Sequence, residues 1–359
     1  MKRKGKIQSI TIGDRLVGEG CPCFIIAEIG TNHNSDLACA RELVRVSSEA
    51  GVDAVKFQIY EADDIVNHRI LTEEYGLQDL YVESTMHQVF DRYLRTPREW
   101  FPELSEYARE LGVLPMATAH SGAGASFIAG QGMAAVKIAS MDLNNLPVLR
   151  DIVERVKVPV IFSTGMSELP EIDETVRIFK KYGKPYAILH CVSNYPAEFA
   201  ELQLQNIRVL REMYGVPVGF SDHTLTTISS VAAVFLGASI IEKHITLNQS
   251  DLGPDHPFAL EPAELKKLVE DIRRVESAYA PEAGFVGPGE RERAKRILYR
   301  RSLVARRDLE AGSVIREEDI KITRPGNGIL PKDLGSVIGR ITLKKIEAET
   351  PLQWEMIES

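Results

Sequence analysis

The chain has 359 residues, of which 44% are hydrophobic and 26% are charged, as in an ordinary globular protein. Its formal net charge of -8, with no long basic stripe to offset it, argues against a nucleic-acid partner. The length exceeds that of a usual single domain, so we expect one large domain and a small one.

Four cysteines in so long a chain do not make a disulfide framework, which points to a reducing compartment. The basic N-terminal stretch has no apolar segment of a signal peptide behind it, and no run approaches the roughly 18 apolar residues of a membrane span. We therefore expect a cytoplasmic protein with no membrane partner.

Residues 7–20 alternate apolar and polar side chains around a Gly-Asp turn, which predicts a small hairpin at the floor of the domain that follows. Short runs rich in Val and Ile come next, each followed by a turn and a helical pattern. Continuous apolar runs are typical of parallel strands that are buried on both faces. The runs span residues 23–30, 53–58, 113–119, 134–140, 158–165, 186–192, 216–222 and 239–246.

Eight strand–helix units in about 250 residues are the number that a (β/α)8 TIM barrel requires. An open doubly wound sheet is the alternative, but no glycine-rich dinucleotide-binding motif follows an early strand. We therefore predict an α/β protein with a barrel domain over residues 1–280. Residues 61–94, after the second strand, form an insert longer than an ordinary loop, on the side where active-site walls are made.

The pattern changes after residue 280. Residues 281–299 are rich in Pro, Gly and charge, which predicts a linker. Residues 300–359 contain short alternating runs broken by turns, which predicts a small, mostly β domain.

Polar residues at the carboxyl ends of barrel strands indicate an active site. Lys56 and Lys137 each share a strand face with small residues, so both can point toward the barrel axis. Two ammonium groups in one cavity repel each other unless an anion joins them, which favours a phosphate-bearing ligand. The alternative is that each lysine forms a structural ion pair with a neighbouring carboxylate. The hydroxyl donors available to an anion are Ser140, Ser163, Thr164, Ser193 and Ser221.

Two histidines, His223 and His244, close the seventh and eighth strands, which are neighbours in such a barrel. With carboxylates from Glu28, Glu242 or Asp255, they could hold Mn²⁺ or Mg²⁺ in an octahedral site completed by water. A closed zinc site is less favoured because no thiolate lies beside them. Strand alternation places Glu242 and His244 on the inner face of the last strand, with the intervening lysine on the outer face.

Nine short motifs follow one another along the chain: IIAEIGTNH, VKFQ, KIAS, FSTGM, LHCVSNYP, GFSDHT, EKHIT, GPDH and RPGNG. In this order they resemble the sialic acid synthase family, meaning the N-acetylneuraminate synthases and their legionaminate, pseudaminate and spore-coat relatives. The resemblance covers nearly the whole chain, and residues 300–359 resemble the antifreeze-like (SAF) domain of that family. The SMD motif at residues 140–142 departs from the family's usual SGE or SGD.

The resemblance implies a transferase that condenses phosphoenolpyruvate with an N-acylated hexosamine, either N-acetylmannosamine or a di-N-acetylated 6-deoxyhexose. The products would be a nine-carbon 2-keto sugar acid and phosphate, released by C–O cleavage. His223 and His244 would bind the divalent metal, and Glu28 would orient or deprotonate the water beside it. The residues implied to hold phosphoenolpyruvate are Lys56, Thr118, Lys137, Ser140, Ser163, Ser193 and Ser221.

The resemblance also implies a sugar-binding set and a domain-swapped homodimer, in which the arginine of the RPGNG motif reaches the sugar of the other subunit. The residues implied to hold the sugar are Gln58, Asp142, Tyr195, Asp255 and Arg324. The role of His120, which follows the third strand near the predicted metal, stays open.

Two other functions remain open on the residues alone. A different metal-dependent barrel aldolase could use one of the lysines as a Schiff-base nucleophile. A non-catalytic carbohydrate-binding protein is the less favoured alternative, because a scaffold has no need of two inward lysines and paired strand-end histidines.

Overall fold

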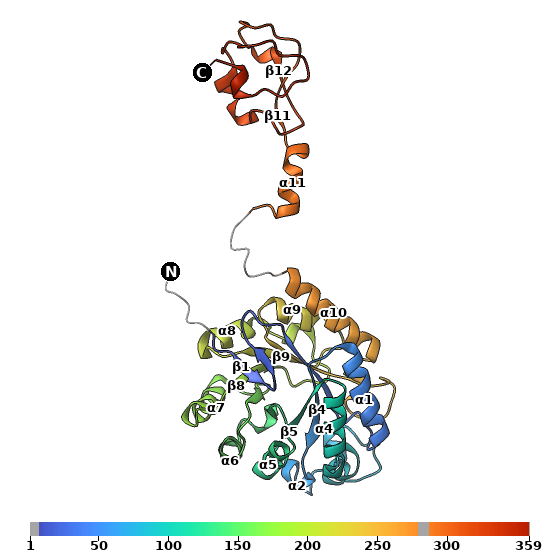
Figure 1. Cartoon of the computed structure of the whole chain (residues 1–359). Helices are drawn as coiled ribbons and strands as arrows, with labels where there is room; N and C mark the ends of the chain where they lie inside the picture. Colours follow the sequence, from blue (N-terminus) through green and yellow to red (C-terminus); the bar gives the residue numbers. More distant parts are fainter. Residues whose placement is uncertain (1–6, 279–286, 359) are drawn as a thin grey trace. The chain divides into compact units, whose positions relative to one another are not determined.

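Eight parallel strands close into a barrel in the order β10-β3-β4-β5-β6-β7-β8-β9, and Figure 1 shows the helices arranged around it. This closed parallel sheet confirms the predicted TIM barrel. Each of its strands overlaps one of the apolar runs identified above. The barrel strands are β3 (Phe24–Gly30), β4 (Ala54–Ile59), β5 (Leu114–Ala119), β6 (Val136–Ile138), β7 (Val160–Ser163), β8 (Tyr186–Cys191), β9 (Val218–Asp222) and β10 (Ile240–His244).

A layer of helices surrounds the strands. Local sequence signals set the ends of these helices: α1, for example, is capped by the Asp36 carboxylate and ends at Gly51, whose φ of 85° favours glycine. The helices of this layer are α1 (Leu37–Ala50), α4 (Phe101–Glu110), α5 (Gly122–Gly130), α6 (Leu146–Arg155), α7 (Leu169–Lys181), α8 (Gln205–Tyr214), α9 (Ile228–Phe235) and α10 (Pro262–Ala278).

The computed structural model describes residues 7–278 and 287–358. Contacts divide the chain into two units, residues 1–281 and 282–359. In the described part of the chain, no helix is both long and apolar enough to cross a membrane.

The predicted N-terminal hairpin is confirmed as an antiparallel pair, β1 (Ile10–Ile12) and β2 (Arg15–Val17). Its buried side chains Ile10, Ile12 and Val17 belong to one apolar cluster with inward residues of the strands, among them Phe24 and Met116. This cluster fills the lower part of the barrel, so polar side chains have room only toward the carboxyl ends of the strands. A larger apolar cluster fills the space between strands and helices.

The insert at residues 61–94 contains short helices, α2 (Ala62–Ile65) and α3 (Met86–Val89). Its own small cluster includes Met86, Val89 and Leu94. The insert, which follows the carboxyl end of β4, therefore packs around a small apolar core of its own.

The C-terminal unit contains α11 (Glu290–Tyr299), β11 (Ser302–Ala305), β12 (Ile320–Thr323) and α12 (Leu334–Val337). β11 and β12 pair antiparallel over a buried apolar cluster that includes Leu303 and Leu352. The second half of the segment predicted as a linker forms α11, while residues 281–286 lie outside the described residues. The Ile297 carbonyl of α11 accepts a hydrogen bond from the Gly326 amide (2.7 Å), so α11 belongs with this unit.

Candidate active site

Strand register brings charged side chains to one level at the carboxyl end of the barrel. Glu28 of β3 lies beside Lys56 of β4 on one side and His244 of β10 on the other. On the next pair of strands, Glu242 lies beside Ser221. Side chains at one level of neighbouring strands point the same way, so these groups meet inside the barrel.

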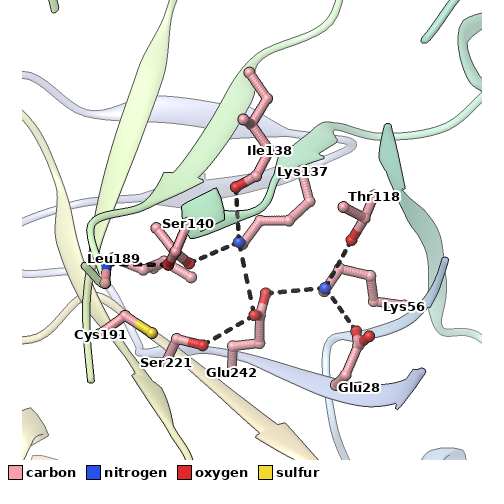
Figure 2. A network of polar contacts seen from close by, with 12 residues as sticks. Glu28, Lys56, Thr118, Lys137, Ile138, Ser140, Leu189, Cys191, Ser221 and Glu242 are labelled. Atoms are coloured by element: carbon pink, nitrogen blue, oxygen red, sulfur yellow. Dashed lines mark hydrogen bonds and ion pairs between the residues drawn. The ribbon is translucent and has the colours of Figure 1, made fainter. Parts of the chain in front are cut away.

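Lys56 belongs to a buried polar network that Figure 2 shows. Its Nζ is 2.7 Å from Oε2 of Glu28 and 3.5 Å from Oε2 of Glu242. It also donates a hydrogen bond of 3.0 Å to the hydroxyl of Thr118. The Glu28 carboxylate in turn accepts a hydrogen bond of 2.9 Å from the side-chain amide of Gln58.

Lys137 enters the same network from β6. Its Nζ donates to the Ser163 hydroxyl (2.6 Å) and lies 3.8 Å from Oε1 of Glu242. That carboxylate oxygen also accepts a hydrogen bond of 3.1 Å from the hydroxyl of Ser221. Glu242 therefore lies between the two ammonium groups (Figure 2).

The position of Glu242 changes one argument made from the sequence. Repulsion between Lys56 and Lys137 is relieved by this carboxylate, so the lysines do not by themselves require an anion. The structure contains the ion pairs of the alternative interpretation. Because the contact of Lys137 to Glu242 is the longer one, its ammonium group is the more available to a ligand.

Burial and charge set the protonation of these groups. Burial lowers the pKa of Lys137, whereas the two glutamates more than offset burial at Lys56 and raise its pKa. Burial raises the pKa of Glu28. Burial acts the same way on Glu242, but Lys137 and Lys56 outweigh it and hold its pKa below the ordinary value. Glu28 is thus the carboxylate better suited to accept a proton.

Hydroxyl groups converge beside Lys137 at the ends of β6, β7 and β8. The Ser140 hydroxyl accepts a hydrogen bond of 3.0 Å from the Gly165 amide. A Cβ atom at Gly165 would lie 2.1 Å from Oγ of Ser193 and 2.9 Å from Oγ of Ser140, so only glycine lets these serines meet there.

The imidazoles of His223 and His244 lie side by side, with ring centroids 5.5 Å apart. Nδ1 of His223 is 2.9 Å from the Val192 carbonyl, which orients the ring. Nδ1 of His244 is buried without a hydrogen-bond partner and lies 3.6 Å from Oδ2 of Asp255. Burial, together with the nearby positive charges, holds the pKa of His244 well below its usual value, so the ring is neutral.

A neutral imidazole with an unpartnered buried nitrogen is suited to bind a metal ion. With His223 and the carboxylates of Glu28 and Asp255, the donor set fits a divalent cation such as Mn²⁺ or Mg²⁺. In the described ranges, three donor side chains whose ligand atoms all lie within 4.8 Å of one another occur at Asp63, His68 and His87, but not at the barrel mouth. A cation at the barrel mouth would therefore take part of its coordination from water.

Most residues that the sequence predicted for the site line one cavity. These are Glu28, Lys56, Gln58, Thr118, Lys137, Ser140, Ser163, Tyr195, Ser221, His223 and His244. The lining does not include Ser193, whose hydroxyl lies beside Gly165. It also lacks Asp142, whose Oδ2 lies 2.8 Å from Nδ1 of His120, and Asp255, which accepts a hydrogen bond of 3.2 Å from the Thr31 hydroxyl. Arg324 lies in the C-terminal unit, with its guanidinium 5.3 Å from the Tyr299 ring centroid.

Sequence reasoning missed several residues that line the cavity. Ile65 and Phe90 reach it from the insert, and Tyr60 and Cys191 from the ends of β4 and β8. Sγ of Cys191 lies 3.9 Å from Nδ1 of His223, so the expectation that no thiol lies beside the histidines was wrong. It also placed Glu242 on the inner face without pairing it to the lysines. The signal for Tyr60 was available, because the strand period of two residues places it on the same face as Lys56 and Gln58.

The fold and this geometry define a (β/α)8 barrel with an enzyme-type polar site at the carboxyl ends of its strands. The chain belongs to the NeuB family, whose sequence model matches residues 43–283. A SAF domain matches residues 300–358.

Relatives of known name share nearly the full length. The chain is 38% identical to the N,N'-diacetyllegionaminic acid synthase of Legionella pneumophila, over 95% of this chain and 96% of that protein. It is 30% identical to the human N-acetylneuraminate-9-phosphate synthase, over 96% and 95% of the two chains. The crystal structure of an N-acetylneuraminic acid synthetase from Leptospira borgpetersenii, in complex with citrate, has a TM-score of 0.70 and 31% identity, covering 80% of this chain and 95% of that one. The predicted resemblance is thereby confirmed at the level of the family.

Proposed function

We propose that the protein is a transferase that condenses phosphoenolpyruvate with an N-acylated hexosamine to give a nine-carbon 2-keto sugar acid and phosphate. The observation that carries this proposal is the buried pair of lysines, surrounded by hydroxyl donors and placed beside two imidazoles at the mouth of the barrel. Relatives named as legionaminic acid and N-acetylneuraminate-9-phosphate synthases support it.

Phosphoenolpyruvate carries an anionic phosphate and a carboxylate, which match the cationic and hydroxyl groups of the site. The phosphate would compete with Glu242 for the ammonium group of Lys137, whose ion pair is long at 3.8 Å. The residues proposed to hold phosphoenolpyruvate are Lys56, Thr118, Lys137, Ser140, Ser163, Ser193 and Ser221.

The reaction joins carbon 3 of phosphoenolpyruvate to the aldehyde carbon of the open-chain sugar. Water adds to carbon 2, and the tetrahedral intermediate then loses phosphate by cleavage of its C–O bond. A divalent ion held by His223 and His244 would supply Lewis-acid polarisation of the sugar carbonyl.

Glu28 is proposed to take the proton of the incoming water. Its pKa is raised by burial, which makes the carboxylate a stronger base. Lys56, 2.7 Å from that carboxylate, would hold it in place, and Lys137 would stabilise the charge on the departing phosphate.

The sugar would lie above these groups, between the barrel mouth and the insert. Gln58 and Tyr195 line the cavity there, and Asp142 and Asp255 lie at its edge beside His120 and His244.

We further propose a domain-swapped homodimer in which Arg324 reaches the sugar site of the partner. We also propose a cytoplasmic location, which the free cysteines support.

Phosphate release tests this function. Purified protein is incubated with phosphoenolpyruvate and Mn²⁺ or Mg²⁺ together with N-acetylmannosamine, its 6-phosphate, or a di-N-acetylated 6-deoxyhexose. We expect release with at least one sugar, together with the mass of the matching nine-carbon acid. Absence of release with every sugar, from protein shown to be folded, would refute the proposal.

Borohydride trapping distinguishes the aldolase alternative. A Schiff-base aldolase needs a lysine of lowered pKa, a description that Lys137 meets. Because our proposal forms no bond between lysine and substrate, we expect no reduced adduct after borohydride treatment with pyruvate. A stable mass increase on Lys137 would favour the aldolase.

A further inference from the structure

Three side chains with metal-binding atoms meet on the insert, outside the polar network of the barrel mouth. Nε2 of His68 and Nε2 of His87 each lie 2.9 Å from the same oxygen, Oδ1 of Asp63. The two imidazole rings are stacked, with centroids 3.8 Å apart and an interplanar angle of 28°. Within the described residues, this is the group of His and acidic side chains whose donor atoms all lie within 4.8 Å of one another.

The three residues come from separate segments of the insert. Asp63 lies in α2, His68 in the loop after it, and His87 in α3. The Asp63 and His68 side chains are exposed, while that of His87 is mostly covered. An ion bound to all three would therefore have protein on one side and water on the other.

We propose that Asp63, His68 and His87 form a binding site for a transition-metal dication of the Zn²⁺ type. Imidazole nitrogen and carboxylate oxygen are donors that such ions accept, whereas Mg²⁺ and Ca²⁺ prefer oxygen alone. Zinc bonds of about 2.0–2.1 Å hold tetrahedral ligands about 3.3 Å apart. The two separations from Asp63, at 2.9 Å, lie a few tenths of an ångström below this value, and the two imidazole nitrogens lie within 4.8 Å of each other.

Ion binding would join the two short helices that carry part of the cavity wall. Ile65 ends α2, and Phe90 directly follows α3; both line the cavity of the candidate active site. The neighbouring Asp64 accepts a hydrogen bond of 3.0 Å from the Ser121 hydroxyl, at the start of α5. The bound ion would thus cross-link the insert and stiffen this wall without taking part in the reaction.

Zinc binding by the full chain tests the site, with any affinity tag removed. A His223→Ala/His244→Ala background removes the two imidazoles that we propose as metal ligands at the barrel mouth, and circular dichroism checks its fold. Titration with ZnCl₂ by isothermal calorimetry is expected to give one equivalent in this background. Adding His68→Gln and His87→Gln should weaken that binding at least about tenfold, as loss of metal-site groups does.

A matched control lies on the same insert. Asp63→Asn should weaken Zn²⁺ binding, whereas Asp79→Asn, which changes another exposed carboxylate of the insert, should not. Zn²⁺ affinity unaltered by the two glutamine substitutions would overturn the site, since it would show that Asp63 only accepts hydrogen bonds from the imidazoles. If the background variant fails to fold, the same substitutions in the wild-type chain should lower the Zn²⁺ stoichiometry by one.

Limited proteolysis tests the cross-link itself. Zn²⁺ should slow cleavage within residues 61–94 in the background variant, and this protection should disappear with His68→Gln and His87→Gln. Zn²⁺ binding without any protection would overturn the cross-linking role.

Discussion

Lys243 and Asp222 form an ion pair behind the barrel mouth, with Nζ 3.3 Å from Oδ1 and neither side chain exposed. Lys243 also donates to the Thr224 carbonyl, and Asp222 accepts hydrogen bonds from the hydroxyls of Ser229 and Ser230. The pair joins β9, β10 and α9, and its two members directly precede the strand-end histidines His223 and His244. Alternation along β10 therefore separates this structural lysine from the two lysines of the cavity.

Replacing Asp222 with Ala should lower the free energy of unfolding by about 3–5 kcal/mol, because it leaves a buried amino group without its carboxylate. Urea denaturation followed by circular dichroism measures the loss. Asp151→Ala is the matched control, since the Asp151–Arg155 pair is 40% and 51% exposed, and a change under about 1 kcal/mol is expected there. Equal effects of the two substitutions would contradict the structural importance of the buried pair.

Replacing Lys137 with Met should raise the KM for phosphoenolpyruvate by about ten- to a hundredfold, the amount that a hydrogen bond to a charged group supplies. Steady-state phosphate release measures the effect. Lys157→Met changes an exposed lysine and should leave KM as it is in the wild type. An unchanged KM in Lys137→Met would remove this residue from the proposed phosphate site.

Replacing His244 with Ala should abolish turnover with Mn²⁺, because the proposed metal site loses one of its two imidazoles. Mn²⁺ binding followed by electron paramagnetic resonance should weaken at least about tenfold in parallel. Turnover at the wild-type rate in this variant would show that His244 is not a ligand.

His33 predicts a pH dependence of stability. Its buried ring lies 3.0 Å from the Thr96 hydroxyl, and burial, followed by the nearby His256, lowers its pKa from 6.5 to about 4. Between these pH values the unfolded chain binds one more proton at this residue than the folded chain. The free energy of unfolding should therefore fall on acidification through this range, with His33 contributing about 1.4 kcal/mol per pH unit.

Urea denaturation at a series of pH values from about 4.5 to about 7 measures this slope. This range lies close to the interval between the two pKa values of His33, about 4 when folded and 6.5 when unfolded. His190, His244 and His256 also have lowered pKa values and act in the same direction. The difference between the wild-type chain and His33→Gln therefore isolates the contribution of His33. Identical slopes for the two proteins would contradict the prediction.

The proposed domain-swapped dimer predicts complementation between two inactive variants. Arg324→Ala damages the C-terminal unit, and Lys56→Ala damages the barrel. If the arginine acts across the dimer, co-refolded mixtures should regain part of the activity, because one intact site can form from two damaged subunits. Activity no higher in the mixture than in either variant alone would argue against an arginine that acts between subunits.

The sequence by itself determined the barrel and the side on which its site lies. Continuous apolar runs such as residues 158–165 can be buried on both faces only in a covered parallel sheet. The period of two residues along a strand placed Glu242 and His244 on the inner face and Lys243 on the outer face, as the structure has them. These properties depend on local order along the chain, so they can be read from neighbouring residues.

The tertiary structure alone decided which charges meet. Glu242 lies between Lys56 and Lys137 because barrel closure brings β10, β4 and β6 around one axis, which no local pattern encodes. Asp63 and His87, far apart in sequence, likewise come together only when the insert packs. Distances across a closed barrel depend on register and packing between segments, and these are set by the whole fold.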